Sequence, residues 1–359
     1  MHQTGFFDLP DHLKRLSDAG DPLEALAQTV DFEVFRPVLD RALDYSDGSK
    51  GGRPPYDPVS MFKVLILAAQ NNVSDERMEF LIRDRLSWMR FLGFDLGKPT
   101  PDENTIRMFR ERLMKAGAFK TLFDAFDRQL QTSGYLPMGG QIVDATLVSA
   151  PRQRNNEDEK TAIKQGRKAD DIWPDEPAKA AQKDTDARWT VKFSKAKTKQ
   201  DGTTHATDIA IPTFGYKNHI TIDARFGFIR SFAVTDAAKH DGKMLRRIVT
   251  RDNTGSNVWT DTAYRSRTNE KWLERHGRTS QIHHKKPRGQ PMPDHIRRGN
   301  ATRSKTRARV EHVFGELKSR MGLFIRTIGI ARAEAKIALA NLAYNMKRLI
   351  FHEGRTAKA

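Results

Sequence analysis

Apolar residues recur at helical spacing through the first 135 or so residues of the chain. The four clearest runs are residues 57–72, 74–94, 100–117 and 119–130. Their starts carry the signals of helix N-termini: Asp57 precedes a proline, Ser74 opens the second run, and Thr100 with Glu103 forms a capping box. The pattern predicts an all-α N-terminal domain over residues 1–135. Its short helices with basic faces fit a helix-turn-helix DNA module or a plain helical cap equally well.

The period of the pattern changes from helix to strand at about residue 136. Residues 141–149 alternate, two further strands flank a tight turn at 225–227, and short strands at 257–261 and 279–284 follow between helical stretches. Strands first joined by a hairpin and then alternating with helices predict one mixed sheet covered by helices. The expected fold class is therefore α/β, with the sheet after an all-α region.

One segment of this second part lacks the periodic pattern. Residues 151–209 are polar and carry charges of both signs, and their few large apolar residues are Trp173, Trp189 and Phe193. The composition predicts a flexible insertion that is partly disordered until a ligand binds. We expect the sheet domain to span residues 136–350, with this insertion inside it and a tail over 351–359.

Basic residues outnumber acidic ones, and they are clustered. The formal net charge is +17 and the isoelectric point is near 10.0. Between Arg265 and Arg309 there are 14 Lys and Arg against 3 Asp and Glu, so +11 of that charge lies in 45 residues. A protein that is merely basic and soluble would interleave its charges. The clustering therefore favours binding of a polyanion through its phosphates.

The chain has no cysteine, which excludes disulfides and thiolate metal sites and is typical of an intracellular protein. No run reaches the roughly 18 consecutive apolar residues that a membrane span requires. We therefore expect a soluble, cytoplasmic protein that does not enter a membrane. Its metal ligands, if it has any, must be carboxylates or histidines.

Two carboxylates stand out on the predicted strands. Asp144 interrupts an apolar alternation, where a bare buried charge would be very costly; the alternative is an edge strand that leaves Asp144 in solvent. Asp261 closes a short apolar strand, and polar groups at the carboxyl ends of strands are where sites form in such sheets. The alternative for Asp261 is an aspartate that only caps the next turn.

A third carboxylate is selected by helical geometry in residues 307–324. At 100° per residue, one arc of this helix is apolar and carries Val310, Val313, Phe314, Leu317 and Met321. Arg307, Glu311 and Lys318 share a polar strip along the edge of that arc, whereas Glu316 falls opposite and is expected in solvent. Spacing therefore favours Glu311 over Glu316. An ordinary surface pair of Arg307 with Glu311 remains the alternative.

Three acids on two strands and a helix indicate a site for a hard cation. Mg²⁺ prefers oxygen ligands and is usually held by a few carboxylates together with substrate phosphates. Two such ions can activate the attacking oxygen and stabilise the leaving oxygen of a phosphodiester displacement. The surrounding basic residues would hold the DNA backbone that delivers the phosphate.

Four stretches of the chain are similar to motifs of one family. They are IVDATLVSAP at residues 142–151, GYKNHITID at 215–223 with FAVTDAAKHD at 232–241, WTDTAYRS at 259–266, and the triplet Arg307, Glu311 and Lys318. In order and spacing the chain resembles a DDE transposase of a bacterial insertion sequence, of the insertion-sequence-five family in the transposase-11 group. The family's fuller C-terminal signature has a tyrosine where this chain has Ser304.

The resemblance implies an RNase H-like catalytic core and a set of site residues. Asp144, Asp261 and Glu311 would be the catalytic acids and the ligands of two Mg²⁺ ions, with Mn²⁺ able to substitute. Tyr264 and Arg265 would touch DNA near the scissile phosphate, by stacking and by phosphate pairing; the alternative for Tyr264 is packing under the loop. The other expected DNA contacts are Lys285, Lys286, Arg288, Arg297, Arg298, Arg303, Lys305, Arg307 and Lys318.

The function expected from this resemblance is transposition. The protein would bind the terminal inverted repeats of its own element, cut there with Mg²⁺ and water, and join the freed 3′-hydroxyl ends to target DNA. Paired ends imply a homodimer on DNA, at the bacterial nucleoid, with the N-terminal domain helping in end binding and dimerisation. The alternatives are a structure-selective nuclease on the same core and a DNA-binding protein derived from a transposase that has lost catalysis.

Overall fold

The computed structural model of the chain describes residues 8–45, 54–194, 209–287 and 289–356. The chain forms two compact units. The first, here the helical unit, is Met1–Leu136 with Ser319–Gly322 and Ala338–Ala359, and the second, here the sheet unit, is Pro137–Lys318 with Leu323–Ile337.

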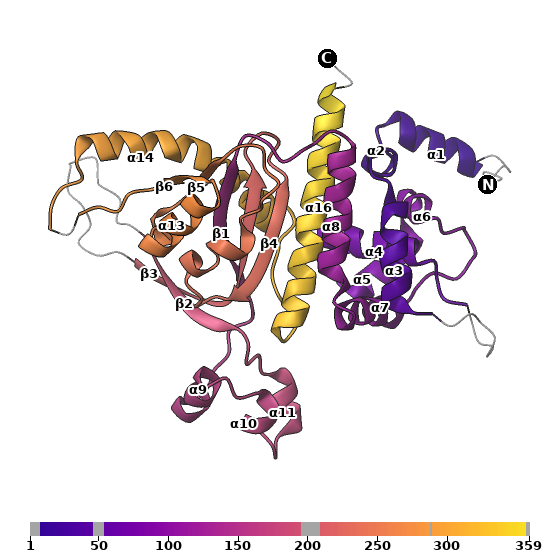
Figure 1. The fold of residues 1–359 in the computed structure, drawn as a ribbon. Helices are drawn as coiled ribbons and strands as arrows, with labels where there is room; N and C mark the ends of the chain where they lie inside the picture. Colours follow the sequence, from indigo (N-terminus) through magenta and orange to yellow (C-terminus); the bar gives the residue numbers. More distant parts are fainter. Residues whose placement is uncertain (1–7, 46–53, 195–208, 288, 357–359) are drawn as a thin grey trace, which may run out of the picture. The chain divides into compact units, whose positions relative to one another are not determined.

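The N-terminal region is all helical, as predicted. Its elements are α1 (Asp8–Asp18), α2 (Pro22–Thr29), η1 (Phe32–Phe35), α3 (Arg36–Leu43), α4 (Pro58–Asn71), α5 (Asp75–Asp84), α6 (Leu86–Leu92), α7 (Glu103–Lys115) and α8 (Ala118–Thr132) (Figure 1). Helix α4 is buried over most of its length, and the rings of Phe35, Phe62 and Phe126 pack together in the core. Capping by Asp57 and Ser74 occurs as the sequence predicts.

Two local predictions in this region were wrong. The predicted helix over residues 74–94 breaks at Arg85, whose backbone is extended, so it forms α5 and α6 instead. The predicted capping box does not form, because Asp102 rather than Thr100 caps α7: Asp102 Oδ1 accepts from the amide of Thr105 at 2.7 Å. The hydroxyl of Thr100 instead accepts a hydrogen bond from Arg83 at 3.0 Å.

The C-terminal helix α16 (Ile330–Thr356) belongs to both units. Its residues up to Ile337 belong to the sheet unit, and its residues from Ala338 onward belong to the helical unit. Within that unit Tyr135 donates to Glu353 at 2.8 Å, which fixes this end of the helix. The helix thus continues past residue 350, where a tail had been expected. Among the described residues, none of the helices is both long enough and apolar enough to cross a membrane.

The sheet unit contains one mixed sheet. Its strands are β1 (Gln141–Ser149), β2 (Arg188–Ser194), β3 (Ile209–Asp223), β4 (Ile229–Asp236), β5 (Asn257–Thr260) and β6 (Thr279–Ile282). The order is β2-β3-β1-β5-β6, with β4 also paired to β3; β3 runs antiparallel to its neighbours, whereas β1, β5 and β6 are parallel. The predicted α/β class and mixed sheet are confirmed.

Helices cover both faces of β1. On one face, Val143 of β1 and Val258 of β5 pack with residues of α12 (Leu245–Ile248) and α13 (Arg267–Arg275). The alternation of the strand turns Asp144 to the other face, where α14 (Asp294–Arg307) and α15 (Arg309–Gly315) lie against β1. The five residues of the predicted apolar arc, from Val310 to Met321, are all buried, as expected.

Strand β3 changes partners at Gly215. Its residues from Gly215 onward pair with β1, and its residues up to Gly215 pair with β2. The glycine has φ +149°, and a Cβ at this position would collide with the carbonyl oxygen of Val148. A residue without a side chain is therefore required where the two ladders meet.

The described part of the insertion is folded, so the expectation of disorder was wrong there. It forms α9 (Glu157–Lys164), α10 (Ala169–Ile172), α11 (Pro177–Gln182) and strand β2. Trp173 packs with Ile163 and Ala180 in a small core, and its indole nitrogen donates to Glu159 at 2.8 Å. One buried tryptophan thus organises three short helices whose composition is otherwise polar. The rest of the insertion, residues 195–208, lies outside the described residues.

Candidate active site

Asp144 lies in the middle of the central strand of the sheet. Only 9% of the residue is exposed, and β1 has a neighbour on both sides, so the alternative of an edge strand with a solvated aspartate is wrong. Asp144 Oδ1 accepts from the amide of Ala145 at 2.8 Å. A carboxylate in this position needs a cationic partner.

The register of the parallel ladder brings Asp261 to Asp144. Gln141 pairs with Val258 and Ile142 with Trp259. The same offset, continued by two residues beyond this last pair, sets Asp261, the first residue after β5, beside Asp144. Asp261 also caps the turn η3 (Thr262–Tyr264), because its Oδ1 accepts from the amide of Ala263 at 2.8 Å.

Glu311 lies near Asp144 because both carboxylates pair with Arg307. The guanidinium of Arg307 lies 2.6 Å from Asp144 Oδ2 through Nη1 and 3.4 Å from Glu311 Oε1 through Nη2. Arg307 Nε is buried and has no hydrogen-bond partner among the described residues. Glu311 itself remains solvent-accessible, with 58% of its side chain exposed. The expected pair of Arg307 with Glu311 is thus present, but it also includes the buried aspartate.

The three acids affect one another electrostatically. Burial raises the pKa of Asp144 to about 7, against the lowering effect of the Arg307 charge and the amide of Ala145. The charges of Asp261 and Glu311 raise that pKa further. The charges of the three carboxylates therefore interact, and positive charge brought close to the buried Asp144 would be favourable.

The donor set fits a hard cation, although the acids are not yet arranged around one. Three carboxylates and no sulfur are the ligands that Mg²⁺ or Mn²⁺ prefers. Among the described residues, however, no three His, Asp or Glu side chains are grouped closely enough to hold a metal ion. The Arg307 guanidinium bridges Asp144 and Glu311 instead. Metal binding at this place requires Arg307 to move from Asp144.

Tyr264 is buried away from any DNA contact, whereas Arg265 is partly exposed and bonded within the protein. Tyr264 has no exposed surface, because η3 turns its ring into the core beside Val143 and Val258, so stacking on a base is excluded in this structure and the packing alternative holds. Arg265 donates to the carbonyls of Ile282 and His283, and these bonds tie η3 to the end of β6. The guanidinium of Arg265 also pairs with Glu270 at 3.1 Å, and 24% of its side chain remains exposed.

A second polar group lies behind the acids on the α12 side of the sheet. Asp241, in the turn η2 (Asp241–Lys243), pairs with Lys217 of β3 at 2.8 Å. His219 Nδ1 lies 4.0 Å from the same carboxylate oxygen, and burial lowers the pKa of His219 to about 4, so the imidazole is neutral. Lys217 and His219 were missed, although their period-two spacing in GYKNH places both on one face.

Several of the basic residues expected to bind DNA lie on the helix α14, and others lie in the loop before it. Helix α14 has no buried residue, so no apolar pattern marked it in the sequence. Arg298 and Lys305 are exposed, Arg297 pairs with Asp294, and Arg303 donates to Gln281. Lys285 and Lys286 are exposed in the loop before α14, and Arg288 lies outside the described residues.

Lys318 lies in η4 (Glu316–Arg320), a π-helical turn that directly follows α15. The residue is exposed as a whole, but partial burial and the nearby charge of Lys192 lower the pKa of Lys318. Glu316, expected in solvent, is partly buried. Short π-helical segments often occur at functional sites, and this one widens the helix at the basic position of the predicted signature.

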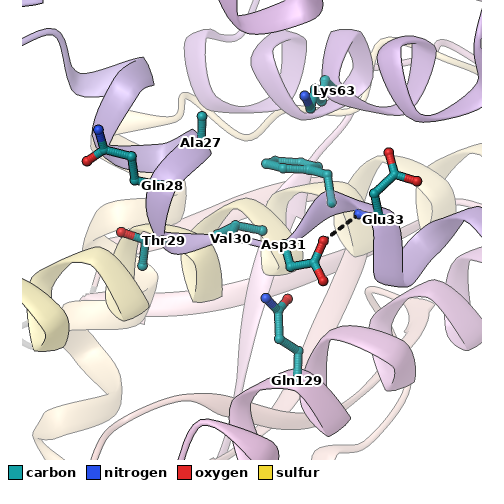
Figure 2. A pocket seen from close by; sticks show the side chains of 9 residues that line it. Ala27, Gln28, Thr29, Val30, Asp31, Glu33, Lys63 and Gln129 are labelled. Carbon is teal, nitrogen blue, oxygen red and sulfur yellow. Dashed lines mark hydrogen bonds between the residues drawn. The ribbon is translucent and has the colours of Figure 1, made fainter.

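A cavity of about 380 Å³ lies in the helical unit (Figure 2). It is lined by residues 27–33 together with Lys63 and Gln129. Burial lowers the pKa of Lys63, whose ammonium lies over the rings of Phe32 and Phe91. The cavity belongs to the unit that does not contain Asp144, Asp261 and Glu311 and is no part of the carboxylate site.

The sheet unit is an RNase H-like domain, as its strand order and its carboxylates indicate. One carboxylate lies on the first strand, one follows the neighbouring parallel strand, and one lies on a helix that covers the sheet. The comparison with protein families agrees: the family described as Transposase DDE domain matches residues 136–346, and the family described as Transposase domain (DUF772) matches residues 11–112. The chain belongs to the DDE transposases. No solved structure matches it.

Proposed function

We propose that this transposase acts on the ends of its own insertion sequence. It binds the terminal inverted repeats, hydrolyses a phosphodiester bond at each end, and joins the resulting 3′-hydroxyl ends to target DNA. The observation that carries this proposal is the convergence of Asp144, Asp261 and Glu311 at one end of the parallel strands. Its placement in the insertion-sequence-five family is part of the same proposal.

Asp144, Asp261 and Glu311 would hold the divalent cations, Mg²⁺ in the cell with Mn²⁺ able to substitute. Bound there, the cations would activate water or a 3′-hydroxyl and stabilise the leaving oxygen. The protein supplies the geometry: the β1–β5 register fixes the two aspartates, and α15 brings Glu311. Burial of Asp144 excludes much of the competing water.

DNA would approach along the basic surface beside these acids. Arg307 and Lys318 would contact phosphates at the element's end, and the exposed cations of α14 and of the loop before it would hold phosphates further along. Neither Arg298 nor Lys305 has a carboxylate partner among the described residues. Two DNA ends joined in one event require two active sites, so a homodimer would form on DNA.

The test uses a supercoiled plasmid that carries the gene with its flanking DNA. Wild-type protein, Asp261→Asn and the control Asp252→Asn, an exposed aspartate in the loop before β5, are each incubated with Mg²⁺ or with EDTA. We expect metal-dependent breaks at the element's ends with wild type and the control, and none with Asp261→Asn.

Other outcomes identify the alternatives. Breaks without joined products would indicate a nuclease on the same core. DNA that is bound but never cut would indicate a binding protein without catalysis. Equal cutting by Asp261→Asn would mean that the carboxylates assigned here are not the active site.

A further inference from the structure

Strand β2 and the first half of β3 form a two-stranded ribbon with one apolar face (Figure 1). Residues that pair directly across two strands point to the same side of the ribbon. The six residues of this side, here the ribbon face, are all apolar and pair as Trp189 with Phe214, Val191 with Pro212, and Phe193 with Ala210. The alternation along both strands thus gathers them on one surface.

Most of the ribbon face is uncovered. Phe214, at its base, is buried, and its ring centroid lies 5.4 Å from that of Trp189. From there outward the exposure rises, to 44% for Trp189, 49% for Val191 and 65% for Phe193. Soluble monomers rarely leave neighbouring large apolar side chains in water, and a patch of this kind marks an interaction site.

The neighbouring segments of the insertion offer no cover for the ribbon face. Residues 195–208, which connect the two strands, read KAKTKQDGTTHATD and contain no large apolar residue. The apolar side chains of α9, α10 and α11 are already packed around Trp173. The cover must therefore come from another molecule.

The absence of charge on the ribbon face indicates which molecule this is. None of its six residues is charged, whereas the opposite face of the ribbon carries Lys192. DNA backbone binding depends on cations that neutralise phosphates, so the ribbon face does not suit it. A second copy of the chain presents the same apolar face, and a two-fold axis pairs identical patches with each other.

The ribbon face is too small to hold two copies together by itself. With strands about 4.8 Å apart and a rise of about 3.4 Å per residue, its flat area is on the order of 200 Å², whereas stable interfaces bury about 800 Å² on each partner. Two chains of net charge +17 also repel each other. DNA neutralises part of this charge, so the contact is expected between copies that are held on DNA.

We propose that two copies of this chain pack ribbon face against ribbon face when each is bound to one end of the element. This inference rests on the proposed function, because it takes the paired DNA ends as the place where the dimer forms. The packing removes Trp189, Val191 and Phe193 of both copies from water. Val191 and Pro212 form the middle pair of the face, so a change at Val191 should affect the contact most directly.

The experiment compares binding of one DNA end with pairing of two. Duplexes from the two flanks of the gene carry a donor dye and an acceptor dye, and energy transfer in EDTA reports pairing of the ends. Val191→Glu places a charge on the ribbon face, and the matched control Ile211→Glu places it on the opposite face. Both residues are β-branched and 49% exposed. We expect pairing to be about tenfold weaker with Val191→Glu than with the control, since like charges would meet in the contact. Affinity for a single duplex, measured by anisotropy, should be equal in both.

Single cysteines test the contact directly, because the chain has no cysteine of its own. Val191→Cys and Ile211→Cys are each labelled with pyrene, whose excimer emission requires two labels in contact. Addition of end DNA should produce excimer emission from the labelled Val191→Cys protein and none from the labelled Ile211→Cys protein.

The other outcomes separate this inference from the proposed function. If wild type pairs the two ends and Val191→Glu pairs them as well as Ile211→Glu does, the ribbon face is not the contact. A selective loss of single-duplex affinity in Val191→Glu would mean that the ribbon face binds DNA rather than a second copy. Wild-type protein that binds each duplex but never pairs two would refute the homodimer of the proposed function, and this inference with it.

Discussion

Arg307 and Asp144 form an ion pair at 2.6 Å although 163 residues separate them in the chain. The pair joins the end of α14 to the middle of β1 and neutralises a carboxylate that is almost fully buried. A guanidinium and a divalent cation cannot both occupy the same side of one carboxylate, because their charges repel. The free enzyme therefore holds its first acid with its own arginine.

Removal of Arg307 should make metal binding easier in the absence of DNA. At pH 8.5, where Asp144 is ionised, Arg307→Gln is expected to bind Mn²⁺ about tenfold more tightly than wild type, since it loses a competing charged hydrogen bond. Calorimetry without DNA measures this difference. Arg303→Gln, which loses a bond to Gln281 and none to the acids, is the control. Weaker binding by Arg307→Gln would show that the arginine supports the metal rather than competing with it.

The pKa of Asp144 gives a stability signature in the metal-free protein. Its folded value of about 7 lies above its ordinary value of 3.8, so the folded state holds the proton more tightly. Asp144 therefore contributes its full stabilisation to the free energy of unfolding below about pH 4, and this contribution is lost as the pH rises to about 7. Compared with Asp144→Asn, the unfolding free energy of wild type should fall by about 1.4 kcal/mol per pH unit across this window. Denaturant titrations of both proteins from pH 4 to 8 provide the measurement, and parallel profiles would contradict it.

The exposed cations of α14 should contribute to DNA affinity without sequence preference. Lys305→Ala and Arg298→Ala are each expected to reduce the slope of log affinity against log salt by about 1, as for one phosphate contact. Fluorescence anisotropy over a range of salt concentrations measures that slope. Lys160→Ala removes an exposed lysine that pairs with Glu157 in the insertion, and it should leave the slope unchanged. An equal change in all three variants would indicate only the effect of total charge.

The insertion should depend on Trp173. Trp173→Ala removes the centre of a core that holds α9, α10 and α11 together, at a cost of about 3 kcal/mol or more. We expect faster proteolysis between residues 157 and 182 and an unchanged unfolding transition of the sheet. Trp189→Ala, a tryptophan with 44% exposure on β2, is the comparison and should leave the cleavage rate as it is. Wild-type resistance in Trp173→Ala would mean that the insertion is held by the strands alone.

The sequence predicted those features that depend on local periodicity. The alternation in β1, the strand that ends at Asp261 and the buried arc from Val310 to Met321 all follow from spacing. Together they were enough to select the three acids. The three acids come together only through the parallel pairing of β1 with β5. An α/β fold class leads one to expect such pairing, but the sequence of neither strand alone specifies its register.

Other features depend on contacts between distant segments. Tyr264 and Arg265 follow Asp261 at once, but whether they face DNA or the core is decided by the η3 turn and by the carbonyls at the end of β6. Helix α14 has no buried apolar face, so the sequence contains no hydrophobic periodicity that would predict it as a helix. The insertion folds around one tryptophan, Trp173, and its mostly polar composition gave no indication that a single residue would form a core.

The order of the acids along the chain also controls when the protein becomes able to act. Asp144 precedes Asp261 by 117 residues (261 − 144) and Glu311 follows Asp261 by 50 (311 − 261). The helical unit likewise needs residues from Ala338 onward. A chain still on the ribosome has therefore exposed its first acid without the other two, and an early-terminated product can never assemble the set. The three acids can therefore come together only after the chain has been synthesised through Glu311.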